Sequence, residues 1–220
     1  MSIQNNLNTI LSQIPEHVTL VAVSKTKPIS DLMDAYNAGQ RIFGENKIQE
    51  MTEKYEHMPK DIQWHMIGHV QRNKVKYMAE FVSLIHGVDS LKLLTEINKQ
   101  AKKHNRVINC LLQIKIAEED SKFGMSSNDA KELLLSEDFS ELKNVRITGV
   151  MGMATFTDNN AQIEQEFKRL TATFETLKTI DTSLEIISMG MSGDYSLAID
   201  CGSTMIRVGS SIFGSRNYNN

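Results

Sequence analysis

The sequence is poor in the residues that mark several classes of protein. It has only two cysteines, Cys110 and Cys201, and no Cys-x-x-Cys or Cys/His spacing that predicts a zinc site. Both are interpreted as small core residues, because Cys110 begins an apolar run and Cys201 falls on a predicted helix. So few cysteines fit a reduced, cytoplasmic setting.

Long apolar segments and blocks of one charge are also missing. No apolar segment approaches ~18 residues, and residues 1–6 lack a basic region, so neither a membrane span nor a signal peptide is predicted. The 24 basic and 27 acidic residues are interspersed, which does not indicate nucleic-acid binding. With only three prolines and no Gly/Ser linker, residues 1–220 are predicted to form a single domain.

Eight short apolar segments alternate with segments of helical periodicity. The predicted strands are residues 18–25, 41–46, 64–68, 81–86, 110–116, 145–153, 184–189 and 205–209. Eight alternating strand–helix units favour a parallel, closed (β/α)8 TIM barrel, preceded by an extra helix from Ile3 to Ile14. An open, doubly wound sheet is the alternative, although the first strand is not followed by the Gly-x-Gly-x-x-Gly pattern of a dinucleotide site.

The first strand ends in a lysine. Residues 18–23 are almost all apolar, which is typical of a strand buried on both faces, and the predicted strand ends with Ser24 and Lys25. Burial beside low-dielectric packing disfavours the ammonium form and can make an amine nucleophilic at neutral pH. The alternative is that Lys25 and Lys27 are both solvated loop residues.

Small residues follow the seventh and eighth strands, where barrels of this type often bind phosphate. Ser192 and its neighbours lead from a strand into a predicted helix, and the Ser192 hydroxyl and backbone N–H groups can bind an anion there. Gly209, Ser210 and Ser211 supply a second set of backbone N–H groups. The alternative is a plain helix cap at Ser192 and a tight turn at Gly209.

Arg207 lies between apolar residues of the eighth strand, and a buried arginine needs an acceptor. Either it forms a structural ion pair with a carboxylate at the barrel mouth, such as Glu45, or its guanidinium faces a ligand ring or anion. His65 and His86 stand next to apolar strand residues and are interpreted as hydrogen-bonded core histidines. No carboxylate pair or Ser/His/Asp order is placed for hydrolysis.

A lysine after the first strand, a phosphate cup and an arginine on the eighth strand together look like a pyridoxal 5′-phosphate barrel. Eight sequence motifs, in the same order, resemble the YggS/PROSC family, the pyridoxal phosphate homeostasis proteins. They are residues 22–28 (AVSKTKP), 43–46 (FGEN), 64–68 (WHMIG), 71–74 (QRNK), 121–124 (SKFG), 188–192 (SMGMS), 202–209 (GSTMIRVG) and 212–214 (IFG). The resemblance spans about residues 18 to 216.

The resemblance implies an alanine racemase N-terminal-domain-like barrel and assigns a role to each cofactor residue. Lys25 would form an aldimine with pyridoxal 5′-phosphate, Arg207 would hydrogen-bond the pyridine nitrogen, Asn46 would lie beside the ring, and Ser192, Gly209 and Ser210 would hold the phosphate. Ser210 stands where many relatives have threonine, which also offers a hydroxyl and an N–H. Because arginine stays protonated, it would leave the ring nitrogen unprotonated and weaken the cofactor as an electron sink.

The function that the resemblance implies is intracellular homeostasis of pyridoxal phosphate by buffering or delivery, with effects on amino-acid and keto-acid balance. The expected partners are the cofactor and apo-enzymes that use it, and the barrel allows a monomer. Because the sequence ends at Asn220, a second domain carrying a catalytic group is not expected, and no catalytic residue is assigned. Lys74, Lys115 and Lys122 are interpreted as solvated. A weak amino-acid racemase is the alternative, and a barrel for another phosphate ligand is a third reading.

Overall fold

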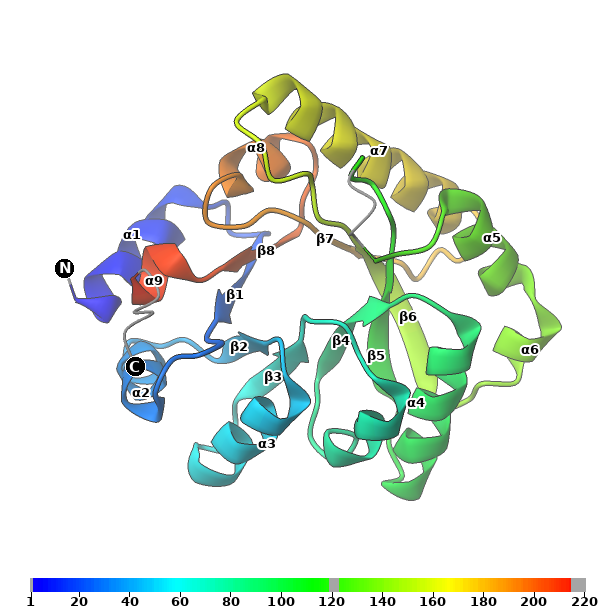
Figure 1. Cartoon of the computed structure of the whole chain (residues 1–220), viewed down its shortest axis with the longest axis horizontal. Coiled ribbons are helices and arrows are strands. Elements are labelled where there is room, and N and C mark those ends of the chain that lie inside the picture. Colours follow the sequence, from blue (N-terminus) through cyan, green and yellow to red (C-terminus); the bar gives the residue numbers. More distant parts are fainter. Residues whose placement is uncertain (1, 119–122, 215–220) are drawn as a thin grey trace.

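A computed structural model describes residues 2–118 and 123–214 of the chain. Within them, parallel strands β1 to β8 pair in sequence order and close into a barrel, with helices around the outside (Figure 1). The predicted (β/α)8 barrel is therefore confirmed. Closure depends on the pairing of β1 with β8, in which Val21 lies opposite Arg207 and Ala22 opposite Val208.

The strands are shorter than predicted because their ends become turns at the barrel rim. Their bounds are β1 Thr19–Val23, β2 Ile42–Glu45, β3 Gln63–Met66, β4 Leu84–Val88, β5 Ile108–Gln113, β6 Val145–Met151, β7 Ile186–Ser188 and β8 Met205–Val208. The fourth strand was misplaced at 81–86. Phe81 and Val82 instead belong to a turn in which both backbone N–H groups donate to the Met78 carbonyl, at 3.1 and 2.9 Å.

The helices follow the predicted periodicity, with differences at their starts. Their bounds are α1 Ile3–Gln13, α2 Ile29–Asn37, α3 Ile48–His57, α4 Leu91–Lys103, α5 Ser127–Leu135, α6 Glu137–Ser140, α7 Asn160–Lys178, α8 Tyr195–Asp200 and α9 Ser210–Phe213. The helix predicted near residue 70 is a 3-10 helix, η1, at Arg72–Tyr77. Ser30 does not cap α2 as expected, because the helix begins at Ile29 after Pro28, whose fixed φ suits a helix start.

Side chains alternate between two cores along each strand. Most buried apolar residues, including Leu20 and Ala22, lie between the strands and the helices. A smaller apolar cluster fills the barrel interior and consists of Val21, Leu84, Leu111, Met151 and Met205. The residue two positions after Leu84 is His86, and two after Met205 is Arg207, so polar side chains occupy the next interior layer towards the strands' carboxyl ends.

The extra N-terminal helix, α1, is also present. It lies beside α9 near the seam between β1 and β8 (Figure 1), and the Asn6 side-chain amide donates to the Ile212 carbonyl at 2.9 Å. Leu7 and Ile10 bury its apolar side. Among the described helices, none combines the length and apolar character needed to cross a membrane.

Candidate functional site

The loop after β1 brings Lys25 to the carboxyl-end mouth of the barrel. Ser24 is fully buried and Lys25 is half-buried, whereas Thr26 is exposed. Thr26 has a φ of 64°, a left-handed conformation that β-branched residues rarely adopt. The Lys27 N–H donates to the Ser24 carbonyl at 3.0 Å, and the Lys27 ammonium donates to the Phe213 carbonyl at 2.8 Å. Lys27 is therefore engaged by α9 rather than solvated.

Asn46 lies at the same mouth, where two glycines allow the backbones of neighbouring strands to approach closely. A Cβ on Gly68 would lie 2.4 Å from the Asn46 carbonyl oxygen, and one on Gly87 would lie 2.7 Å from the Gly68 carbonyl oxygen. Larger residues would separate β2, β3 and β4 at their carboxyl ends. The glycine at the end of WHMIG thus positions the Asn46 backbone.

The loops after β7 and β8 meet, as predicted for a phosphate cup. The Gly209 N–H donates to the Ser192 hydroxyl oxygen at 3.2 Å, which joins residues that are 17 positions apart. Ser192 does not cap α8. The helix begins at Tyr195 after Asp194, and the Asp194 carboxylate accepts the Met191 N–H at 2.5 Å. Asp194 was not predicted to shape this loop.

The contact between Ser192 and Gly209 lies beside the end of β1, which leads into the loop that carries Lys25. A Cβ on Gly209 would lie 3.1 Å from the Val23 carbonyl oxygen, two residues before Lys25. Ser210 follows as the first residue of α9, where backbone N–H groups have no acceptor within the helix. The structure thus brings together the loops bearing Lys25, Ser192, Gly209 and Ser210 at one edge of the barrel.

Arg207 is buried, but its partner is not the Glu45 carboxylate that was one of the two alternatives. Its guanidinium donates to the Ser188 carbonyl at 2.9 Å, the Ser188 hydroxyl at 2.7 Å and the Gly152 carbonyl at 3.0 Å. Burial lowers the pKa of Arg207 to about 10, and Asp194 opposes that shift. The guanidinium is therefore charged at pH 7. Of its five N–H donors, these bonds use three, and two remain without an acceptor among the described residues.

A line of buried hydrogen bonds continues from Arg207 across the barrel interior. Ser188 Oγ lies 3.0 Å from His86 Nδ1, and His86 Nε2 lies 3.1 Å from His65 Nδ1. Because a guanidinium can only donate, we assign the Ser188 proton to the bond with His86 and the His86 Nε2 proton to the bond with His65. Both ring nitrogens of His86 have partners, as expected for a hydrogen-bonded core histidine.

Electrostatics support this assignment of neutral rings. Burial lowers the pKa of His65 to about 3. The pKa of His86 lies well below its usual value, chiefly through burial and also through the nearby His65 and Arg207. Both histidines were predicted to be core residues, whereas Ser188 appeared only as the first residue of the SMGMS motif. Its contact with His86 depends on β4 and β7 facing each other across the barrel interior, which no single segment shows.

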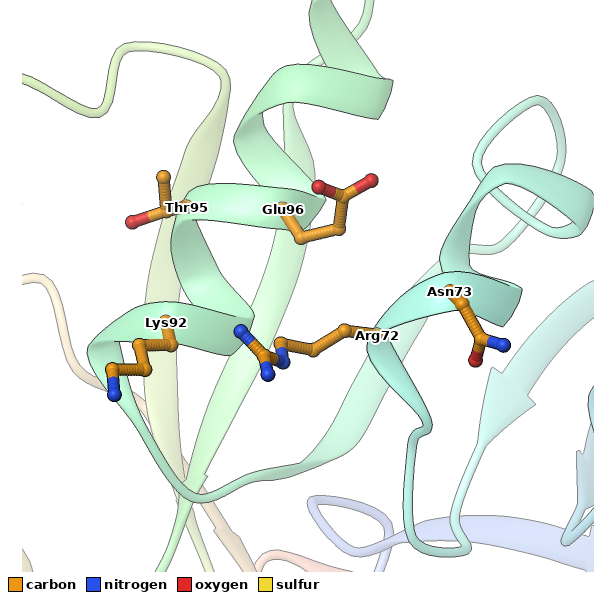
Figure 2. A pocket seen from close by; sticks show the side chains of 5 residues that line it. All are labelled: Arg72, Asn73, Lys92, Thr95 and Glu96. Atoms are coloured by element: carbon orange, nitrogen blue, oxygen red, sulfur yellow. The ribbon is translucent and has the colours of Figure 1, made fainter.

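Two surface cavities lie outside the mouth. The first, of about 370 Å³, lies between η1 and α4, and Arg72 extends from η1 towards the first turn of α4 (Figure 2). The second, of about 650 Å³, lies behind the loop that bears Lys25 and includes Thr26 and Glu50. None of the predicted cofactor residues lines either cavity. Lys115 is exposed and Lys74 is half-buried, while Lys122 lies outside the described residues.

Comparisons with known proteins first define the class of barrel. The family model described as "Alanine racemase, N-terminal domain" matches residues 1–217. Solved alanine racemases share the fold: that of Clostridium difficile superimposes with a TM-score of 0.80 at 14% identity, and the match covers 99% of this chain and 57% of the racemase.

More similar proteins define the family more narrowly. The "Pyridoxal phosphate homeostasis protein" of Haemophilus influenzae is 38% identical, over 99% of this chain and 98% of that protein. Its namesake in Escherichia coli is also 38% identical, over 93% of this chain and 88% of that protein. The structure of PipY from Synechococcus elongatus with PLP bound superimposes with a TM-score of 0.89 at 34% identity, covering 97% of this chain and all of PipY. The chain belongs to the family of pyridoxal phosphate homeostasis proteins.

Proposed function

We propose that this protein binds pyridoxal 5′-phosphate at the barrel mouth and holds it as an aldimine with Lys25. The observation that carries the proposal is the meeting of the Ser192 hydroxyl and the Gly209 N–H at 3.2 Å, beside the strand that delivers Lys25. When a phosphate binds, the Ser192 hydroxyl and the Gly209 N–H would exchange their mutual hydrogen bond for bonds to the phosphate oxygens, and Ser210 would add further donors. PLP bound to PipY supports the same ligand here.

Arg207 and Asn46 would contact the cofactor ring. The guanidinium is fixed by Ser188 and Gly152, and its two remaining N–H donors suit an acceptor such as the pyridine nitrogen. Because Arg207 stays charged, the ring nitrogen would remain unprotonated. Bound cofactor would then be a poor electron sink, which favours holding and releasing it over transformation of amino acids.

The proposed role is therefore a cytoplasmic carrier that buffers pyridoxal phosphate or delivers it to apo-enzymes, and so influences amino-acid and keto-acid balance. The names of its relatives support homeostasis rather than catalysis. We further propose that the chain acts as a single-domain monomer. A weak racemase is the competing function, favoured by the shared fold of alanine racemases. Exchange of the amino-acid α-hydrogen in D₂O faster than with free cofactor would favour the racemase.

Borohydride reduction tests the proposed attachment directly. Reduction of an aldimine fixes the cofactor to its lysine as a stable secondary amine. Peptide mass spectrometry should then find the added mass on Lys25 in the wild type and no adduct in Lys25→Ala. An adduct on another lysine, such as Lys27, or no adduct at all, would contradict the proposal.

A further inference from the structure

A buried lysine on α3 lies directly behind the loop that presents Lys25. Lys54 is only 5% exposed, although most lysines are solvated. Its ammonium donates to the Ser24 carbonyl at 2.8 Å, to Glu45 Oε1 at 2.8 Å and to Glu50 Oε1 at 2.7 Å. All three acceptors belong to the loop itself or to carboxylates that contact it.

The two carboxylates hold the residues on either side of Lys25. Glu45 Oε1 accepts the Ser24 hydroxyl at 2.5 Å, and Glu50 Oε1 accepts the Thr26 N–H at 2.6 Å. The second of these bonds fixes the residue that has the left-handed backbone. We name Lys54, Glu45 and Glu50 the loop clamp, because together they bind the backbone before and after Lys25.

Holding these charges inside the fold is unfavourable in itself. Glu45 is fully buried, and its Oε2 atom has no hydrogen-bond partner among the described residues. Burial raises the pKa of Glu45, and the adjacent Lys54 opposes that shift. A buried ion pair is often no more stabilising than apolar residues of the same size. The loop clamp is therefore poorly explained as a device for stability alone.

We propose that Lys54, Glu45 and Glu50 are positioning residues that fix the loop so that the Lys25 amine meets the aldehyde of the bound cofactor. The proposal rests on the proposed function and adds residues from β2 and α3 to the site. Its geometric basis is that the Lys25 backbone is restrained on both sides through one buried ammonium. Misplacement of a reacting group by about 1 Å can slow a reaction about 100-fold.

The experiment compares two ligands that differ only at the reacting carbon. Pyridoxal 5′-phosphate carries the aldehyde, whereas pyridoxine 5′-phosphate carries an alcohol and cannot condense with an amine. Lys54→Met keeps most of the length of the side chain and removes its charge. We expect it to slow aldimine formation and to weaken pyridoxal phosphate binding by about tenfold or more, with pyridoxine phosphate binding changed by less than about twofold.

A second variant guards against simple misfolding. Lys54→Met leaves Glu45 without its counter-ion, so Lys54→Met with Glu45→Gln removes both charges and should fold better while still lacking the bonds to Ser24 and Glu50. Lys99→Met, an exposed lysine on α4, is the matched control and should behave as wild type.

Each outcome has a distinct meaning. Selective loss of aldehyde binding in either Lys54 variant supports the loop clamp. Equal weakening of both ligands would show a merely structural role, and unchanged binding and rate would show no role; either result overturns the inference while the proposed function stands. If the wild type itself forms no aldimine, the proposed function fails first.

Discussion

Replacement of Ser188 by alanine tests the line of hydrogen bonds that anchors Arg207. The hydroxyl is fully buried, accepts a bond from the guanidinium at 2.7 Å and lies 3.0 Å from His86 Nδ1. Its removal leaves a charged donor with one acceptor fewer and a buried ring nitrogen with none. A bond to a charged group contributes about 1.5–3 kcal/mol, and an unsatisfied buried group costs about 1–3 kcal/mol.

We therefore expect Ser188→Ala to lower the free energy of unfolding by about 2–4 kcal/mol, since the two effects overlap. For a chain of 220 residues, that is a fall of about 5–10 °C in the unfolding midpoint. Urea unfolding of the cofactor-free protein measures the change, with the exposed Ser127→Ala as control. In a double-mutant cycle with His86→Leu, the two changes should be strongly non-additive. A loss below about 0.5 kcal/mol, or additive effects, would refute the assigned bonds.

Three further predictions use the same purified protein. Gly149→Ala should lower the free energy of unfolding by about 3 kcal/mol or more, because the added Cβ would lie 1.9 Å from a carbonyl oxygen of β7. Gly193 has open space around it, so Gly193→Ala should be nearly neutral in urea unfolding. Lowering the pH from 7.5 to 5 should reduce the free energy of unfolding by about 2 kcal/mol for each of His65 and His86, because both have folded-state pKa values below the usual 6.5 and bind protons only on unfolding. His86→Gln should remove about half of this pH dependence. An unchanged pH dependence in that variant would contradict the prediction. Ser192→Ala should weaken pyridoxal phosphate binding about tenfold by losing one charge-assisted bond, as equilibrium dialysis would test.

The alternation of apolar strands and amphipathic helices predicts the barrel because both periodicities depend on local sequence. Boundaries are less predictable. The apolar residues Phe81 and Val82 suit a strand, yet their N–H groups turn back to Met78, and β4 begins later at Leu84. Pairing with neighbouring strands decides such a boundary, and pairing is not visible in a single segment.

The candidate site, too, could be predicted only where local sequence determines it. Lys25 and Gly209 were singled out because they lie at the ends of apolar strands, and Arg207 because it lies between apolar residues within one. Ser192 was predicted to cap α8, but its hydroxyl instead accepts the Gly209 N–H. Lys54 gave no signal, because a lysine in an ordinary amphipathic helix is expected in solvent. Only the packing of α3 against the end of β2 buries it beside Glu45.

Visible absorption spectra with added pyridoxal phosphate, recorded for the wild type, Lys25→Ala and Lys27→Ala, show whether Lys25 holds the cofactor as an aldimine. We expect an aldimine band in the wild type and in Lys27→Ala, and its loss in Lys25→Ala. A band that persists in Lys25→Ala, or is absent from the wild type, would contradict the assignment of Lys25 as the residue that holds the cofactor.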